Sequence, residues 1–242
     1  MSNKIVRTTG QFIPTAVDDN VDLWHVMPLW KLETFLNGGI WFARLDQFNT
    51  RYEGTLPNKN LGLLRMLLGN QSRTVQSQYE DIAQKAYASC WHMNTGEPLD
   101  EMWTEFNGEV AIKTSSAKMR ELVSHIPACK NGGPAYFGQV NYINYATEMI
   151  SDVNALYASF TVDDSFENVE IEARLLICTD AIPLNHKVYD YMTDDKRAII
   201  LPIDPKDFIG EIIIRASLDD HQANRVRQAI KVKGLGDKIK ES

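Results

Sequence analysis

The sequence predicts an α+β fold: a single domain of mixed, mostly antiparallel sheets flanked by helices. Three observations lead to this prediction. Segments rich in β-branched and aromatic residues alternate along the chain with amphipathic helical segments. The last strands follow one another too closely for the helical crossovers that parallel strands need. No linker rich in Pro or Ser and no internal repeat divides the 242 residues, which suffice for one large core.

The first part of the expected domain is a strand, a helix and a second strand. Residues 1–20 are predicted to be an irregular lead-in, and residues 21–242 form the domain. The segment VDLWHV (21–26) has the pattern of a short strand, and IWFARL (40–45) has that of a second. Between them, PLWKLETFLNGG places its apolar residues on one helical face, and two glycines end the helix.

Helices and strands continue to alternate in the rest of the chain. The patterns predict helices at 60–70, 73–88, 115–126, 146–160 and 218–235. They predict strands at 87–93, 109–114, 136–145, 169–179, 197–203 and 208–216. Ser115 or Ser116 is the expected N-terminal cap of the helix predicted at 115–126. Residues 95–108 are predicted to form a turn and a short helix, in which Met102 and Trp103 are the expected core anchors.

Composition limits the classes of function. The formal net charge is −7 and no stripe of Lys and Arg is present, so a general nucleic-acid surface is not expected. No apolar run is long enough to cross a bilayer and no secretory signal precedes the domain, so no membrane partner is expected. Three scattered cysteines without a CxxC pair indicate a reducing, cytoplasmic compartment.

The segment GIWFARLDQFNTRYEG concentrates charge at the end of a strand. The part from residue 44 onward contains Arg44, Asp46, Asn49, Arg51 and Glu53. Arg44 or Arg51 is suited to hold a pyrophosphate through paired hydrogen bonds. Asp46, Asn49 and Glu53 are suited to hold the loop or the substrate. The alternative interpretation is a closed network of the same side chains that only braces the fold.

Two other strands carry histidines. The sequence around His25 is typical of a half-buried histidine that is hydrogen-bonded to a backbone carbonyl. The alternative interpretation is that His25 belongs to the functional site. Cys90 and His92 lie two residues apart and therefore share one face of a strand. A zinc site needs four ligands, or three and a water, and no second compact pair is present. No metal is therefore expected at this strand.

A late strand, VEIEARLLIC, begins charged and becomes apolar. Glu170, Glu172 and Arg174 alternate along it and so point to one face. Such a face predicts the rim of a pocket. Glu172 is expected to be partly desolvated there, with Arg174 as the partner that keeps it ionised.

Taken in order, these motifs resemble the bacterial family catalogued as domain of unknown function 2971. The motifs are LWH followed by PLWKLETFLNGGIWFARLDQFNTRYEG, then ASCWHMNTGEPLDEMW, GEVAIKTS, GQVNYINY, FENVEIEARLLI and LPIDPKDFIGEIIIRA. The resemblance covers most of residues 22–235. Some relatives of this family look like ADP-ribosyltransferases at one remove, which implies an ADP-ribosyltransferase-like fold.

The resemblance implies an enzyme that transfers ADP-ribose from NAD to an acceptor macromolecule, or hydrolyses NAD, in a defence or toxin system. It implies one cleft lined by His25, Arg44, Trp91 and Glu172. His25 would bond a ribose, and Trp91 would stack on a ring of the nucleotide. Glu172 would stabilise the ribosyl cation as it develops, and Glu170 would activate the acceptor.

Two alternatives stay open. One is a non-catalytic module of the same fold that binds a ligand or a protein. The other is a metal-dependent hydrolase that uses His25, Cys90 and His92 as ligands.

Overall fold

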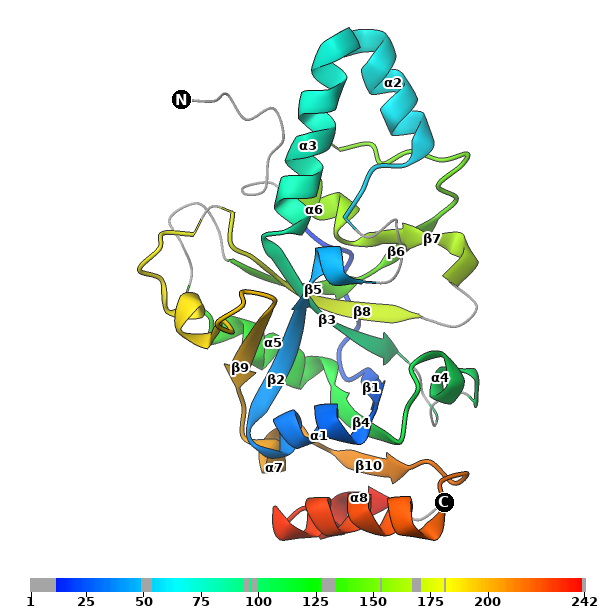
Figure 1. The fold of residues 1–242 in the computed structure, drawn as a ribbon, viewed down its shortest axis with the longest axis vertical. Helices are drawn as coiled ribbons and strands as arrows, with labels where there is room; N and C mark the ends of the chain where they lie inside the picture. Colours follow the sequence, from blue (N-terminus) through cyan, green and yellow to red (C-terminus); the bar gives the residue numbers. More distant parts are fainter. Residues whose placement is uncertain are drawn as a thin grey trace.

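The computed structural model describes residues 12–48, 54–93, 96, 100–127, 134–152, 154–166, 171–180 and 182–240, which form a mixed α+β fold (Figure 1). The strands are β1 (Asp22–Met27), β2 (Gly39–Arg44), β3 (Ala86–Met93), β4 (Val110–Ser115), β5 (Ala135–Gln139), β6 (Asn141–Ile143), β7 (Thr161–Asp163), β8 (Glu172–Cys178), β9 (Ala198–Pro202), β10 (Glu211–Ile214) and β11 (Ile239–Lys240). The α-helices are α1 (Leu29–Leu36), α2 (Asn58–Leu68), α3 (Ser72–Ala83), α4 (Asp100–Glu105), α5 (Ser116–Ser124), α6 (Ala155–Ala158), α7 (Pro205–Phe208) and α8 (Asp220–Val232).

Most of the strands form one nine-stranded sheet, and helices flank it. The strand order is β11-β10-β4-β1-β3-β2-β9, and β8 pairs with β3 and with β5 off this path. Every recorded pair in this sheet is antiparallel except β10 with β11. A separate parallel pair joins β6 to β7. The predicted class, a mixed and mostly antiparallel α+β fold, is confirmed.

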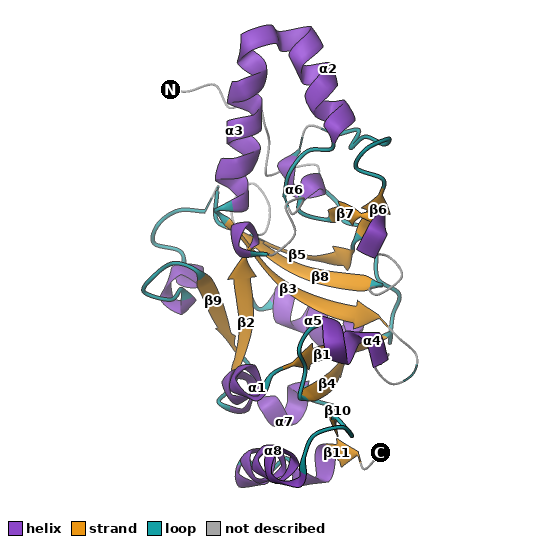
Figure 2. Ribbon diagram, turned by 45° about the vertical axis from the view of Figure 1, so that its right-hand side comes forward, coloured by secondary structure: helices purple, strands orange, loops and turns teal. Residues whose placement is uncertain are grey.

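Strand β3 is shared by three neighbours. One of its edges pairs with β8 along residues 86–92. Its other edge pairs with β2 at Tyr87 and Ala88, and with β1 at His92 and Met93. Between these contacts β1 and β2 diverge, and α1 connects them (Figure 2). We call this gap, along Ser89–Trp91 of β3, the fork.

Apolar layers cover both faces of the sheet. Helices α1, α5, α7 and α8 bury residues such as Phe35 and Val226 against one face. Helices α3 and α6 bury Ile82 and Leu156 against the other, and α4 covers a smaller cluster around Trp103. In the described residues, no helix is both long and apolar enough to span a membrane.

Two local signals in the sequence end or begin elements as predicted. The Ser115 side chain accepts a hydrogen bond from the Lys118 amide at 3.4 Å and so caps α5. Gly38 after α1 has a φ of 86°, a left-handed conformation that glycine adopts without a steric penalty. Its carbonyl accepts a hydrogen bond from the Ile203 amide at 2.9 Å, which ties the end of α1 to the strand β9 region.

The helix predicted at 146–160 is wrong except for α6. Asn144 accepts hydrogen bonds from the amides of Ala146 and Thr147, which favours a turn at the start of the segment. Further on, Asn60 of α2 donates to the Ile150 carbonyl at 2.7 Å and accepts from the Ile150 amide at 2.9 Å. Bonds to a distant helix therefore replace the local helical bonds.

The described part of the predicted lead-in, residues 12–20, carries no helix and packs onto the sheet. Thr15 forms an antiparallel bridge with Gln139 at the end of β5. The Phe12 ring is buried, and it packs edge-on against the Tyr157 ring at 4.8 Å between centroids.

Replacing Trp103 by alanine should lower the free energy of unfolding by about 3–5 kcal/mol, the range for emptying a large aromatic site. Trp103 is only 8% exposed and belongs to the cluster of Trp24 and Met102, which confirms the predicted anchor. Urea unfolding measures the loss. Trp30→Ala is the matched control, because Trp30 is 61% exposed on α1 and should cost under about 1 kcal/mol. Equal losses for the two variants would contradict the buried role of Trp103.

Candidate functional site

The structure does not bring His25, Arg44, Trp91 and Glu172 into one cleft. Successive side chains on β3 point to opposite faces, so Trp91 lies on one face and its neighbour on the other. Glu172 pairs with His92, not with Trp91, and therefore points away from Trp91. The His25 ring lies 5.0 Å from the Trp91 ring, between centroids. The predicted single cleft is wrong, because the register of β3 and β8 separates Glu172 from His25 and Trp91.

His25 lies at the fork. It follows Trp24, which is paired with His92 where β1 meets β3. The Nδ1 atom of His25 lies 2.7 Å from the Cys90 carbonyl oxygen and forms a hydrogen bond with it. The interpretation of His25 as a histidine bonded to a backbone carbonyl is therefore confirmed. The side chain joins the two strands at the point where their backbones separate.

This hydrogen bond decides which nitrogen of His25 carries the proton. A carbonyl oxygen only accepts, so Nδ1 donates and Nε2 of the neutral ring is an acceptor. Nε2 is buried and has no hydrogen-bond partner among the described residues. Burial, and to a smaller extent the charge of Lys31, lowers the pKa of His25, the bond to Cys90 opposes both, and the resulting pKa is about 3. The ring is therefore neutral at physiological pH, with an unmet acceptor.

Lys31 accompanies His25 and was not predicted from the sequence. It lies in the first turn of α1, the helix that connects the two arms of the fork. Desolvation lowers the pKa of Lys31, although part of the residue stays exposed. The Lys31 ammonium forms no hydrogen bond or ion pair with another described residue, and its backbone amide donates to the Pro28 carbonyl at 3.1 Å. A lysine within the helical segment PLWKLETFL is expected to be exposed to solvent, so no sequence pattern indicated that Lys31 belongs to the site.

Trp91 forms the wall behind His25. Its ring is 1% exposed and packs against Phe35 and Phe208 at 6.0 and 5.9 Å between centroids. Its indole nitrogen donates to Ser89 Oγ at 3.0 Å. The prediction that Trp91 stacks on a nucleotide ring is wrong for this structure, because both its faces are used in the core.

Arg44 braces the loop after β2. Its Nε and Nη2 atoms donate to the two carboxylate oxygens of Asp46 at 2.7 and 3.0 Å, and Nη1 donates to the Lys196 carbonyl at 3.3 Å. The hydrogen bond to Asp46 raises the pKa of Arg44. The described part of the loop therefore supports the bracing interpretation for both residues. Asn49, Arg51 and Glu53 lie outside the described residues.

Glu172 and Arg174 form a buried ion pair on the other face of the sheet. Arg174 Nε and Nη2 donate to the two oxygens of Glu172 at 2.6 and 3.0 Å. A third bond runs from Nη1 to the Ser159 carbonyl at 2.7 Å. The side chains are 5% and 0% exposed, so the predicted pairing is confirmed but the predicted pocket rim is wrong. Both Glu172 oxygens are committed to Arg174, which opposes its predicted catalytic role. Glu170 lies outside the described residues.

His92 shares this face with the ion pair. It is buried, its Nδ1 accepts from the Ile171 amide at 3.3 Å, and burial lowers its pKa. The ring is therefore neutral, with its proton on Nε2. Within the described ranges, no group of three or more His, Cys, Asp and Glu side chains is arranged to hold a metal ion.

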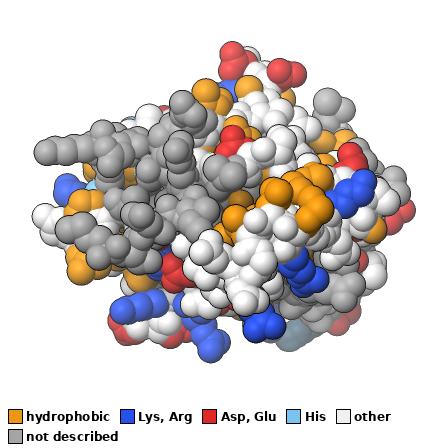
Figure 3. Space-filling view, turned by 90° about the horizontal axis from the view of Figure 1, so that it is seen from above, with side chains coloured by type: hydrophobic (Ala, Val, Ile, Leu, Met, Phe, Trp, Pro, Cys, Tyr) orange, Lys and Arg blue, Asp and Glu red, His pale blue; other side chains and the backbone are white. Residues whose placement is uncertain are grey.

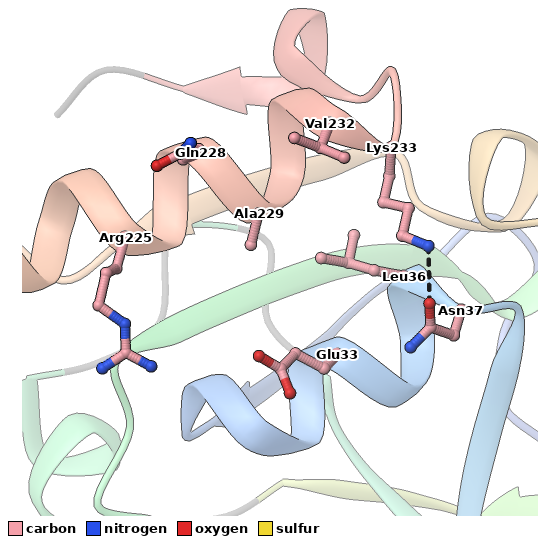
Figure 4. A pocket seen from close by; sticks show the side chains of 8 residues that line it. All are labelled: Glu33, Leu36, Asn37, Arg225, Gln228, Ala229, Val232 and Lys233. Atoms are coloured by element: carbon pink, nitrogen blue, oxygen red, sulfur yellow. Dashed lines mark hydrogen bonds between the residues drawn. The ribbon is translucent and has the colours of Figure 1, made fainter.

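The two described cavities lie away from the predicted residues. One, of about 340 Å³, lies between α1 and α8 (Figure 4). Glu33 and Arg225 enter it from opposite helices, and Lys233 donates to Asn37 at 2.7 Å at its end. The other, of about 390 Å³, lies between α2 and α3. Sequence reasoning missed both, because each needs two helices whose packing no local pattern encodes.

Comparisons with known proteins leave the family open. No family model, no curated protein and no solved structure matches this chain. The resemblance to domain of unknown function 2971, and the likeness to ADP-ribosyltransferases that it implies, therefore stay predictions.

Glu172→Gln should lower the free energy of unfolding by about 3–5 kcal/mol, because it leaves the Arg174 charge buried without a counter-ion. Chemical unfolding at neutral pH measures the change. The double variant Glu172→Gln/Arg174→Met removes the stranded charge and should recover part of the loss. A single variant as stable as the wild type would show that the pair is not structural.

Stability should fall as the pH drops from 7 to 5, in part through His25. The unfolded residue binds a proton near pH 6.5, whereas the folded one stays neutral until about pH 3. The stability that the folded state gains from keeping His25 neutral is thus fully present above pH 6.5, and it is lost as the pH falls toward 3. It amounts to about 2 kcal/mol between pH 7 and 5. His25→Asn keeps a donor for the Cys90 carbonyl and does not titrate. Urea midpoints at both pH values should therefore show a smaller loss for this variant, and an equal loss would contradict the assignment.

Proposed function

We propose that the protein is a binding module for a small anionic ligand with hydroxyl groups, of the nucleotide class, and that the ligand enters the fork. NAD is the first candidate. The observation that supports this proposal is the Nε2 atom of His25, a buried acceptor without a described partner. A buried polar atom left without a partner costs free energy, so its persistence favours a bound donor.

The chemistry of the fork suits two parts of a nucleotide. A ribose hydroxyl is a donor that Nε2 of a neutral His25 accepts. The Lys31 ammonium, partly desolvated and in electrostatic contact with His25, suits a phosphate oxygen. Part of the surface of both residues remains exposed, and a ligand that approaches there has to displace neighbouring side chains to reach the buried Nε2.

Binding without turnover is the better supported form of this proposal. Transfer of ADP-ribose needs a carboxylate beside the ribosyl cation. Glu172 has both oxygens bonded to Arg174 and points to the opposite face from His25. NAD hydrolysis, transfer to an acceptor macromolecule and a place in a defence or toxin system stay predictions, and the assay below includes turnover.

Calorimetric titration with NAD and AMP tests the proposal. Wild-type protein should bind NAD, and Lys31→Met should weaken binding about 10-fold or more, because a charged hydrogen bond to phosphate is lost. His25→Asn should also weaken it, because the variant keeps the donor to Cys90 but lacks Nε2. Arg44→Gln is the matched control, since Arg44 is engaged by Asp46, and its affinity should match the wild type.

Nicotinamide release is followed in the same samples. Binding of NAD without release of nicotinamide supports the proposed binding module. Release of nicotinamide by the wild type would show instead that the protein is an enzyme that cleaves NAD. Absence of binding to both nucleotides, or equal affinity in His25→Asn, Lys31→Met and wild type, would overturn the fork as the site.

A further inference from the structure

The end of the α2–α3 hairpin is an apolar surface that the described residues leave exposed. No residue of α2 is buried, although six of its eleven residues are Leu or Met. Leu63, Met66 and Leu67 are 38%, 74% and 67% exposed, and their spacing places them on one face of the helix. Figure 1 shows the hairpin projecting from the body of the protein. Solvated helices rarely present such a stripe unless another molecule covers it.

A hollow lies beside this stripe, between the two helices. It has a volume of about 390 Å³, and Leu61 and Leu64 contribute to its lining. Arg65 of α2 and Arg73 of α3 line the same hollow. No described residue forms a hydrogen bond or ion pair with either guanidinium. The hollow thus combines two leucines with a mostly polar lining that includes Asn70, Ser72 and Gln76, and with two arginines that have no partner in the described chain.

The charge of the hairpin differs from that of the rest of the chain. Residues 58–79, at the hairpin end, contain Lys59, Arg65 and Arg73 but no Asp or Glu, and the two acids of α3, Glu80 and Asp81, lie in its last turn. The whole chain has a formal net charge of −7. Figure 3, seen from the hairpin end, shows hydrophobic side chains with Lys and Arg side chains near them. A local cationic and apolar surface on an acidic protein attracts an acidic and apolar partner.

We infer that the hairpin end docks an acidic, amphipathic segment of a partner protein. Carboxylates of that segment enter the hollow and pair with Arg65 and Arg73, and its apolar side chains cover Met66 and Leu67 beside it. The planar guanidinium group of arginine suits carboxylates because it can donate hydrogen bonds to both carboxylate oxygens at once.

Other occupants fit less well. A second copy of the chain, docked through the same face, brings cations against cations. Nucleic acid leaves Met66 and Leu67 uncovered. The hairpin carries three cations, fewer than the four to eight basic residues that are typical of anionic lipid recognition.

Fluorescence anisotropy with two labelled peptides tests the inference. One is an amphipathic 18-residue helix of Leu and Glu, and the other has Lys at every Glu position. The acidic peptide should bind the wild-type protein, and Arg65→Gln/Arg73→Gln or Met66→Gln/Leu67→Gln should weaken it 10-fold or more. Raising the salt concentration should weaken it as well. Arg225→Gln/Arg227→Gln is the charge-matched control, because both arginines are exposed on α8 away from the hairpin, and it should change affinity less than twofold. Thermal melting confirms that these exposed substitutions leave the fold intact.

Three outcomes would overturn the inference. The first is equal affinity for the acidic and basic peptides, or no binding of either. The second is sedimentation of the wild type as a dimer that Met66→Gln/Leu67→Gln separates, which assigns the face to a second copy. The third is binding to vesicles of phosphatidylglycerol and phosphatidylcholine that the same variant abolishes, without binding of the acidic peptide.

Discussion

One edge of β3 has to serve two strands, and this constraint organises the molecule. The edge pairs with β2 at one end and with β1 at the other, so the two strands diverge between these contacts. In the gap, the side chain of His25, on β1, donates a hydrogen bond to the Cys90 carbonyl of β3 and so links the two strands. Helix α1 joins the two strands across the gap and brings Lys31 to the same place. The fork is therefore both a discontinuity in the sheet and the point where its polar groups gather.

The two faces of the sheet handle buried polar groups differently. On the fork face, burial keeps the His25 ring neutral, so no charge has to be compensated. On the other face, Glu172 and Arg174 stay charged as a pair. The Ser159 carbonyl accepts a hydrogen bond from Nη1 of the same guanidinium group. A fully bonded ion pair is stable but leaves no oxygen for a ligand. A neutral ring with one unmet acceptor is the more suitable of the two for binding.

The hairpin of α2 and α3 follows a different rule from the rest of the chain. Elsewhere helices bury an apolar stripe against the sheet, as α8 does with Val226 and Ile230. Helix α2 contacts α3 and the Gly69–Gln71 turn before it, packs Leu61, Leu64 and Leu68 only partly against the core, and leaves Met66 and Leu67 in solvent. Burial of apolar surface is the main favourable term in folding. The exposed face of α2 gains no free energy of burial within its own chain, and contact with another molecule can supply it.

The sequence by itself determined the α+β class and most elements, because alternating apolar residues and local caps such as Ser115 act within a few residues. It also predicted the bond of His25 to a carbonyl and the pairing of Glu172 with Arg174, which follows from their spacing of two on one strand. Only the tertiary structure decided that these residues face opposite sides of the sheet, because that depends on the register between β3 and β8. It likewise decided that Lys31 accompanies His25 and that Asn60 holds residues near Ile150 out of a helix. These contacts join residues distant in the chain, and local patterns carry no information about such distances.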